Sequence, residues 1–267
     1  MNSLPELRAS PFPLTKPYPG TVTLDQAEFQ IRCEWGLRGL AELAPASDAV
    51  ILVDVLSFTT ALDIATSRRA IVFPYPLKEP SAADYAVAMD AHLASADRAS
   101  GFSLSPASLQ SLPAGYRLVM PSPNGAALSF HTHHPLVLAA CLRNFEAVAR
   151  AAAHLGSRFA VIPAGETWST GDLRPCLEDL IGAGAVIACL PGTRSPEAEL
   201  AAACFEHFRA DLAGALRQSS SGKELIERGF GRDVELAAKC GVSTSVPRLM
   251  GRCFAGSARP RRPTRRY

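Results

Sequence analysis

The chain has 267 residues, 48% of them hydrophobic and 19% charged, which is enough to bury the core of one globular domain. Five of its 27 basic residues lie within the last nine positions, so the other 22 face 25 acidic residues, a balance that excludes nucleic-acid binding by the folded part. No apolar run reaches the ~18 residues of a membrane span and no apolar segment marks a secretory signal, so we expect a cytoplasmic protein with no membrane partner.

Short apolar runs recur along the first two thirds of the chain, and turn signals and segments with helical spacing follow them. In chain order, we predict strands at residues 29–33, 49–53, 70–73, 117–120, 136–140 and 159–163, with helices at 59–67 and 81–93. Strands that alternate with helices are typical of a largely parallel sheet covered on both faces. The pattern therefore predicts an α/β protein with a three-layer α/β/α architecture and a parallel or mixed sheet.

The pattern changes in the last third, where long segments have helical spacing and few strands are expected. We predict helices at residues 177–190, 196–216 and 224–239, and a linker or flexible loop in the Pro/Ser-rich residues 99–113. The whole chain is thus divided into an N-terminal extension (1–28), a single α/β domain (29–256) and a disordered basic tail (257–267). The pattern alone does not separate one domain from two closely packed halves.

Polar residues follow the predicted strands at the points where an open parallel sheet binds its ligands. Asp54 ends the strand 49–53, and it is a nucleophile, a metal ligand or the N-cap of the next helix. Ser122, Asn124 and Gly125 form a compact loop after another strand, either a phosphate-binding loop or an ordinary turn. Arg143 follows a third strand, where a guanidinium either holds a phosphate or forms a surface ion pair.

Two acidic residues, Glu178 and Asp179, stand at the start of a predicted helix. They are about 100° apart around the helix axis, so we expect one to face the site and the other to act as a cap. If Asp54 meets one of them, two carboxylates beside phosphate donors would form a Mg²⁺ site, because Mg²⁺ binds few protein oxygens and keeps its waters.

Other routes to metal or phosphate chemistry are disfavoured. The histidines of residues 131–134 have no Cys or acidic partners at a metal-binding spacing, so we interpret them as an exposed loop. The chain has no Gly-Lys-Ser/Thr phosphate loop, and the Cys-x5-Arg spacing from Cys253 to Arg259 lacks a strand before it and a helix after it. Its seven scattered cysteines contain no Cys-x-x-Cys pair and predict neither a disulfide framework nor a zinc ribbon.

These motifs, in this order and spacing, resemble those of the 2-phosphosulfolactate phosphatase family. The likeness runs from about Ile31 to Phe254 and rests on the segments Val53 to Leu56 with Thr59 and Thr60, Ser122 to Gly125, Leu142 to Asn144, Ala164 with Gly165, and Leu177 to Leu180. The resemblance implies a Mg²⁺-dependent acid phosphatase of α/β/α architecture that removes phosphate from 2-phospho-3-sulfolactate, a step of coenzyme M biosynthesis. In one position the chain departs from the family, because Ser57 stands where the family usually has arginine.

The leading hypothesis is therefore Mg²⁺-dependent hydrolysis of a small anionic phosphate monoester, either 2-phospho-3-sulfolactate or a related phosphorylated hydroxy acid. We predict that Asp54, Glu178 and Asp179 are catalytic and bind the metal, and that the substrate is bound by Thr59, Thr60, Ser122, Asn124, Gly125, Arg143, Asn144 and Gly165. Losing an arginine at Ser57 would weaken the binding of a doubly anionic substrate.

Two other functions remain open at this stage. The protein would be a non-catalytic binder of a small anionic metabolite if turnover was lost with that arginine, or a polyanion-tethered protein if the Arg-rich tail is its working part. Assembly into homo-oligomers is also left open.

Overall fold

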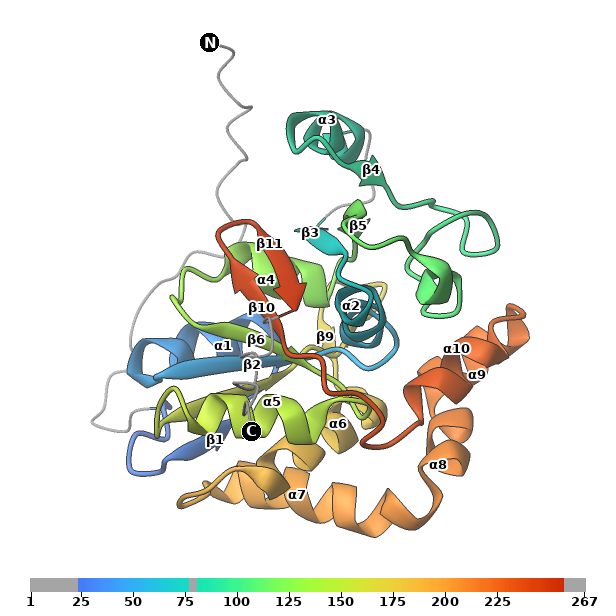
Figure 1. Ribbon diagram of the computed structural model, residues 1–267. Helices are drawn as coiled ribbons and strands as arrows, with labels where there is room; N and C mark the ends of the chain where they lie inside the picture. The colour runs from blue at the N-terminus through green and yellow to red at the C-terminus, as the bar shows by residue number, and fades with distance from the viewer. Residues whose placement is uncertain (1–23, 77–80, 257–267) are drawn as a thin grey trace, which may run out of the picture.

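The computed structural model describes residues 24–76 and 81–256, which form a large sheet with helices on both faces (Figure 1). Its strands are β1 (Ile31–Cys33), β2 (Ala49–Val53), β3 (Ile71–Tyr75), β4 (His92–Leu93), β5 (Arg117–Pro121), β6 (Val137–Ala140), β7 (Phe159–Pro163), β8 (Glu166–Thr167), β9 (Leu173–Arg174), β10 (Pro247–Met250) and β11 (Cys253–Gly256). Its α-helices are α1 (Gly36–Leu43), α2 (Phe58–Ser67), α3 (Ser81–Ala88), α4 (Gly125–His131), α5 (Phe145–Ala153), α6 (Leu177–Cys189), α7 (Pro196–Phe208), α8 (Leu212–Gln218), α9 (Ser220–Glu227) and α10 (Gly231–Ala237). Short 3-10 turns lie at Ala44–Ala46, Ser108–Ser111 and Arg209–Asp211.

The main sheet consists of two parallel blocks joined by an antiparallel hairpin. The strand order is β1-β7-β2-β6-β10-β11-β3-β5-β4, with β1, β7, β2 and β6 parallel in one block and β3, β5 and β4 parallel in the other. The β10–β11 hairpin pairs antiparallel with β6 on one side and with β3 on the other. Three antiparallel steps separate the blocks, so their strands run in opposite directions. The sheet is therefore mixed, as the α/β prediction allowed.

Alternating residues of β2 show how the two helical layers are built. Ile51 and Val53 face the core formed with α5, α6 and α7, whereas Val50 and Leu52 face the core formed with α1 and α4. Successive side chains of a strand point to opposite faces, and all four residues are fully buried. A run of apolar residues without alternation is thus what a strand covered on both sides requires. This confirms the α/β class and the layers of helix on both faces.

Most elements of the first two thirds lie where the sequence predicted them, except that the predicted helix 81–93 ends at Ala88 and His92–Leu93 forms the strand β4. The other main differences are near the C-terminus. The predicted helix 196–216 is interrupted at Arg209–Asp211, and the helix 224–239 is two helices separated at Gly229, which has a φ of +86°. The β10–β11 hairpin was not predicted, and it lies in the middle of the sheet, where it joins the two blocks. Its strands are short and end at exposed or half-buried residues, so they lack the long apolar run of β2.

Residues 99–113 are packed against the rest of the described chain and contain the turn Ser108–Ser111. Leu109 and Leu112 in this segment are fully buried, so it is not a linker between domains. The basic tail and residues 1–23 of the predicted extension lie outside the described residues. None of the helices in the described stretches is long and apolar enough to cross a membrane.

Candidate active site

Asp54 lies at the end of β2, where it connects two distant parts of the chain. Its Oδ1 accepts a hydrogen bond from the Phe58 backbone N–H (3.1 Å) and its Oδ2 accepts one from the Gly125 N–H (2.8 Å). Gly125 begins α4 after β5, and a Cβ added there would lie 2.5 Å from the Phe58 ring and 2.6 Å from Asp54 Oδ2. Only glycine permits this approach. The loop after β5 thus reaches the end of β2, although four strands separate β5 from β2 in the sheet order.

Asp179, in the first turn of α6, links the end of β2 to the end of β7. Its Oδ1 accepts the Val55 N–H (2.7 Å) and its Oδ2 accepts the Gly165 N–H (2.9 Å). Gly165 has a φ of +68°, and a Cβ there would lie 2.8 Å from Leu173 and 2.9 Å from the Arg174 carbonyl oxygen. The ends of β2 and β7 and the start of α6 therefore meet at one carboxylate.

Two glutamates complete an acidic group around Asp54. Glu178 is only 3% exposed and forms no hydrogen bond with the described residues. Glu166, directly after Gly165, accepts a hydrogen bond from the Asn124 side-chain amide (3.0 Å). The two acids at the start of α6 thus differ in their contacts. Asp179 accepts hydrogen bonds from two backbone N–H groups, and Glu178 accepts none from the described residues.

The electrostatics of this group favour protonated or cation-bound carboxylates. Burial, together with the charges of Glu166 and Glu178, raises the pKa of Asp54 to about 6, although two backbone hydrogen bonds oppose the rise. Burial also raises the pKa of Asp179 well above its ordinary value, and the charges of Asp54 and Glu178 add to the effect. Each carboxylate disfavours the ionisation of its neighbours. A strongly perturbed acidic group at strand ends is typical of a functional site.

A large cavity lies beside the acidic group, and Asn124 and Glu166 form part of its wall. Its volume is about 1110 Å³, and most of its lining comes from α1, α4 and the β8–β9 hairpin. The loop 131–134 borders it too, with His131 and His133 exposed. The ring of His134 is hydrogen-bonded to the carbonyl oxygens of Leu136 and Ser47. No group of three or more His, Cys, Asp or Glu residues that could hold a metal ion is found among the described residues.

Two of the predicted substrate-binding residues hold the backbone of the Asp54 turn instead. Thr59 accepts the Asp54 N–H (3.0 Å) and donates to the Asp54 carbonyl (2.7 Å), while Thr60 donates to the Val55 carbonyl (2.8 Å). Both threonines are fully buried, so they position Asp54 rather than face a ligand. Ser122 is also buried, and its N–H donates to the Tyr75 carbonyl.

Arg143 and Asn144 are engaged in internal contacts and are not joined to the acidic group. The guanidinium of Arg143 pairs with Asp63 (2.8 Å) and donates to the Leu236 carbonyl (3.1 Å). Asn144 is fully buried and bonds to the backbone of Cys141, Ala139 and Ser245. The ion pair of Arg143 is thus buried and not at the surface, and its role as a phosphate ligand stays a prediction. Strand direction and strand ends alone do not show which side of a helix such residues occupy.

We expect Arg143→Gln to reduce stability and to leave substrate affinity nearly unchanged. Asp63 is fully buried, and leaving its charge without the arginine costs about 3–5 kcal/mol. Chemical denaturation measures this loss. The surface pair Arg209–Glu206 supplies the control, since both side chains are more than half exposed and Arg209→Gln should cost no more than about 1 kcal/mol. A stable Arg143→Gln variant with a strongly raised KM would instead support the phosphate-binding role.

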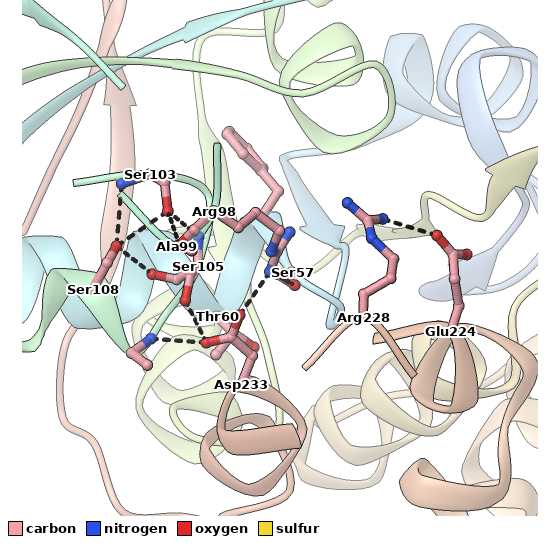
Figure 2. A network of polar contacts seen from close by, with 12 residues as sticks. Ser57, Thr60, Arg98, Ala99, Ser103, Ser105, Ser108, Glu224, Arg228 and Asp233 are labelled. Atoms are coloured by element: carbon pink, nitrogen blue, oxygen red, sulfur yellow. Dashed lines mark hydrogen bonds and ion pairs between the residues drawn. The ribbon is translucent and has the colours of Figure 1, made fainter. Parts of the chain in front are cut away.

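A polar network next to Ser57 contains a residue that the sequence did not indicate (Figure 2). Arg98 Nη2 donates to Ser57 Oγ (2.9 Å) and to Asp233 Oδ2 (2.9 Å). Asp233 also accepts the Ser105 hydroxyl (2.6 Å) and the Ala107 N–H (2.9 Å). A guanidinium from the β4–β5 connection therefore lies at the position where the family resemblance expects an arginine and the chain has Ser57.

Residues 40–252 match the family model described as 2-phosphosulpholactate phosphatase. The match covers well over half of the chain, in agreement with the resemblance found in its motifs. The chain belongs to this family.

The 2-phosphosulpholactate phosphatase family is also represented among the curated relatives of the chain. A probable 2-phosphosulfolactate phosphatase of Gloeobacter violaceus is 34% identical over 138 residues, which cover 51% of this chain and 56% of the relative. The 2-phosphosulfolactate phosphatase of Methanothermobacter thermautotrophicus is 34% identical over 110 residues, or 41% and 46%. A probable 2-phosphosulfolactate phosphatase of Parasynechococcus marenigrum is 32% identical over 201 residues, or 68% and 80%. The chain spans about half the length of the first two relatives.

Proposed function

We propose that the protein hydrolyses a small phosphate monoester, with 2-phosphosulfolactate, the compound named for its relatives, as the first candidate substrate. One observation carries the proposal. Asp54 and Asp179 are buried carboxylates that the backbone N–H groups of Val55, Gly125 and Gly165 hold together at the ends of three strands. Phosphoryl transfer depends mainly on positioning and electrostatic stabilisation. A rigid acidic group of this kind can hold a metal ion and orient the ester.

The acidic group fits Mg²⁺ better than a transition metal. Its donors are carboxylate and amide oxygens, and Mg²⁺ commonly binds through one or two carboxylates together with waters and substrate phosphates. Asp54 and Asp179 already accept backbone N–H groups at both oxygens. We therefore assign the metal to Glu178 and Glu166 alone, two carboxylates rather than the group of three or more ligands that is absent from the described residues. When bound, Mg²⁺ would neutralise part of the negative charge on the phosphoryl oxygens.

The other residues of the site bind and orient the substrate in this proposal. The side chain of Asn124, now bonded to Glu166, turns its amide toward a phosphoryl oxygen when the ester binds. Asp54, with a pKa of about 6, is able to accept a proton from the attacking water and to return it to the leaving oxygen near neutral pH. Thr59 and Thr60 keep the Asp54 turn rigid through their bonds to its backbone.

Phosphate release from purified protein tests the proposal. We expect 2-phosphosulfolactate, or a related phosphorylated hydroxy acid in a panel of small phosphoesters, to be hydrolysed with Mg²⁺ and not after its removal by EDTA. No release from any ester with Mg²⁺ present would overturn the proposal. Thermal stabilisation by such an ester without hydrolysis would then favour the non-catalytic binder.

A further inference from the structure

Arg98 is the strongest unexplained feature near the acidic group. Its side chain is 11% exposed, and it reaches the start of α2 from the connection between β4 and β5. A guanidinium has five N–H donors. Nη2 bonds to Ser57 and Asp233, whereas the buried Nε has no partner among the described residues, and no hydrogen bond of Nη1 to them is found. A buried charged donor without a partner is costly, which indicates that a further acceptor completes this position.

The surroundings of Arg98 favour an anion as that acceptor. The guanidinium carbon of Arg98 lies 5.4 Å from the centroid of the Phe230 ring, and that of Arg228 lies 5.9 Å from the same centroid. Asp233 neutralises one side of Arg98, but its carboxylate also accepts two bonds from the 105–107 segment. Arg228 pairs with Glu224 at the surface, on one side of the network in Figure 2. Two guanidiniums thus share one aromatic ring beside the open donors of Arg98.

Arg98 is joined to the Asp54 turn through Ser57. Its Nη2 donates to Ser57 Oγ, and Ser57 directly precedes Phe58, whose N–H donates to Asp54 Oδ1. The guanidinium and the acidic group thus contact neighbouring residues of one turn, which favours a ligand that carries two acidic groups.

We propose that Arg98 is a specificity-determining residue that binds the second anionic group, a carboxylate or sulfonate, of the phosphate ester. Asp233 and Ser57 orient the guanidinium and leave Nε and Nη1 for the ligand. The proposal rests on the proposed function for the reaction but adds the residue that selects a doubly acidic substrate. It also accounts for Ser57, whose short side chain leaves room for a guanidinium from another loop.

The test compares a phosphate ester that carries a second acidic group with one that lacks it, such as phospholactate and a simple alkyl phosphate. For Arg98→Gln we expect the KM for the doubly acidic ester to rise about 10- to 100-fold, the value of one or two hydrogen bonds to a charged group. The KM for the alkyl phosphate should change less than about threefold. Arg98→Lys keeps the charge without the fork of N–H donors. Its KM for the doubly acidic ester should lie between those of the wild type and Arg98→Gln.

Ser105→Ala provides the control for a merely structural role, because it removes a hydrogen bond between the 105–107 segment and Asp233 and leaves the Arg98–Asp233 pair in place. We expect it to affect both esters to the same extent. Equal effects of Arg98→Gln on the two esters would show that Arg98 only braces the loop, and would overturn the inference.

A binding measurement separates this inference from the proposed reaction. Sulfolactate, which carries a carboxylate and a sulfonate but no phosphate, should raise the melting temperature of the wild type and not of Arg98→Gln. That difference would support the inference even if no ester were hydrolysed. Equal stabilisation of both proteins, or of neither, would contradict it.

Discussion

Asp54→Asn is expected to lower kcat on the order of 1000-fold, the upper range for losing one preorganised electrostatic group at a transition state. The substitution keeps the size of the side chain but removes its charge and one of the two acceptors used by Phe58 and Gly125. It also removes the proton acceptor that we assign to the reaction. Phosphate release at saturating ester, over a range of Mg²⁺ concentrations, measures the effect.

Asp48→Asn is the matched control for this variant. Asp48 precedes the same strand, β2, at its opposite end, and it is an exposed acceptor for the N–H groups of Ser157 and Arg158. We expect Asp48→Asn to retain nearly full activity. An Asp54→Asn enzyme within about tenfold of the wild type would remove Asp54 from the reaction.

The stability of the protein should depend on pH through Asp54. Its pKa is raised from the ordinary 3.8 to about 6 by burial, so the folded state binds the proton more tightly than the unfolded state. The contribution of this shift to the free energy of unfolding is fully present below pH 3.8 and is lost as the pH rises through 6. A shift of about two pH units corresponds to about 3 kcal/mol.

Denaturation of the wild type and Asp54→Asn at several pH values measures this contribution together with the effect of the Asp54 charge on the pKa of Asp179. The free energy of unfolding of the variant, relative to the wild type, should increase by about 2 kcal/mol between pH 4 and pH 7, because part of the change lies below pH 4. Asp48 behaves in the opposite way, because backbone hydrogen bonds lower its pKa. Its contribution is present above pH 3.8 and is lost only at lower pH. A constant difference between wild type and Asp54→Asn would show that Asp54 is not perturbed.

The first block of the sheet could be predicted because its strands are continuous apolar runs. The bounds of β2 and β7 agree with the prediction at every residue, and the two chemically important residues Asp54 and Gly165 lie one and two residues after these strands. The meeting of Asp54 with the loop after β5 was also expected from strand ends. The expectation assumed that β2 and β5 run in the same direction, but β5 belongs to a block that runs in the opposite direction.

The remaining features depend on tertiary contacts that leave little trace in the local sequence. The β10–β11 hairpin joins the blocks through single paired positions, Arg248 with Leu138 and Phe254 with Val72, and no apolar run marks it. Arg98 directly precedes the Pro/Ser-rich residues 99–113, which have the composition of a loop, and only its contacts with Asp233 and Ser57 show that it is fixed. Glu166 had a visible signal, because it directly follows Gly165, but no role was predicted for it.

A crystal structure with Mn²⁺ in place of Mg²⁺ and with inorganic phosphate would test most directly whether these strand ends form one catalytic site. We predict an anomalous peak beside Glu178 and Glu166. We also predict a phosphate close to Asp54, in contact with the ion and with Asn124. A phosphate bound beside Arg143, or a metal ion away from all four acidic residues, would contradict it.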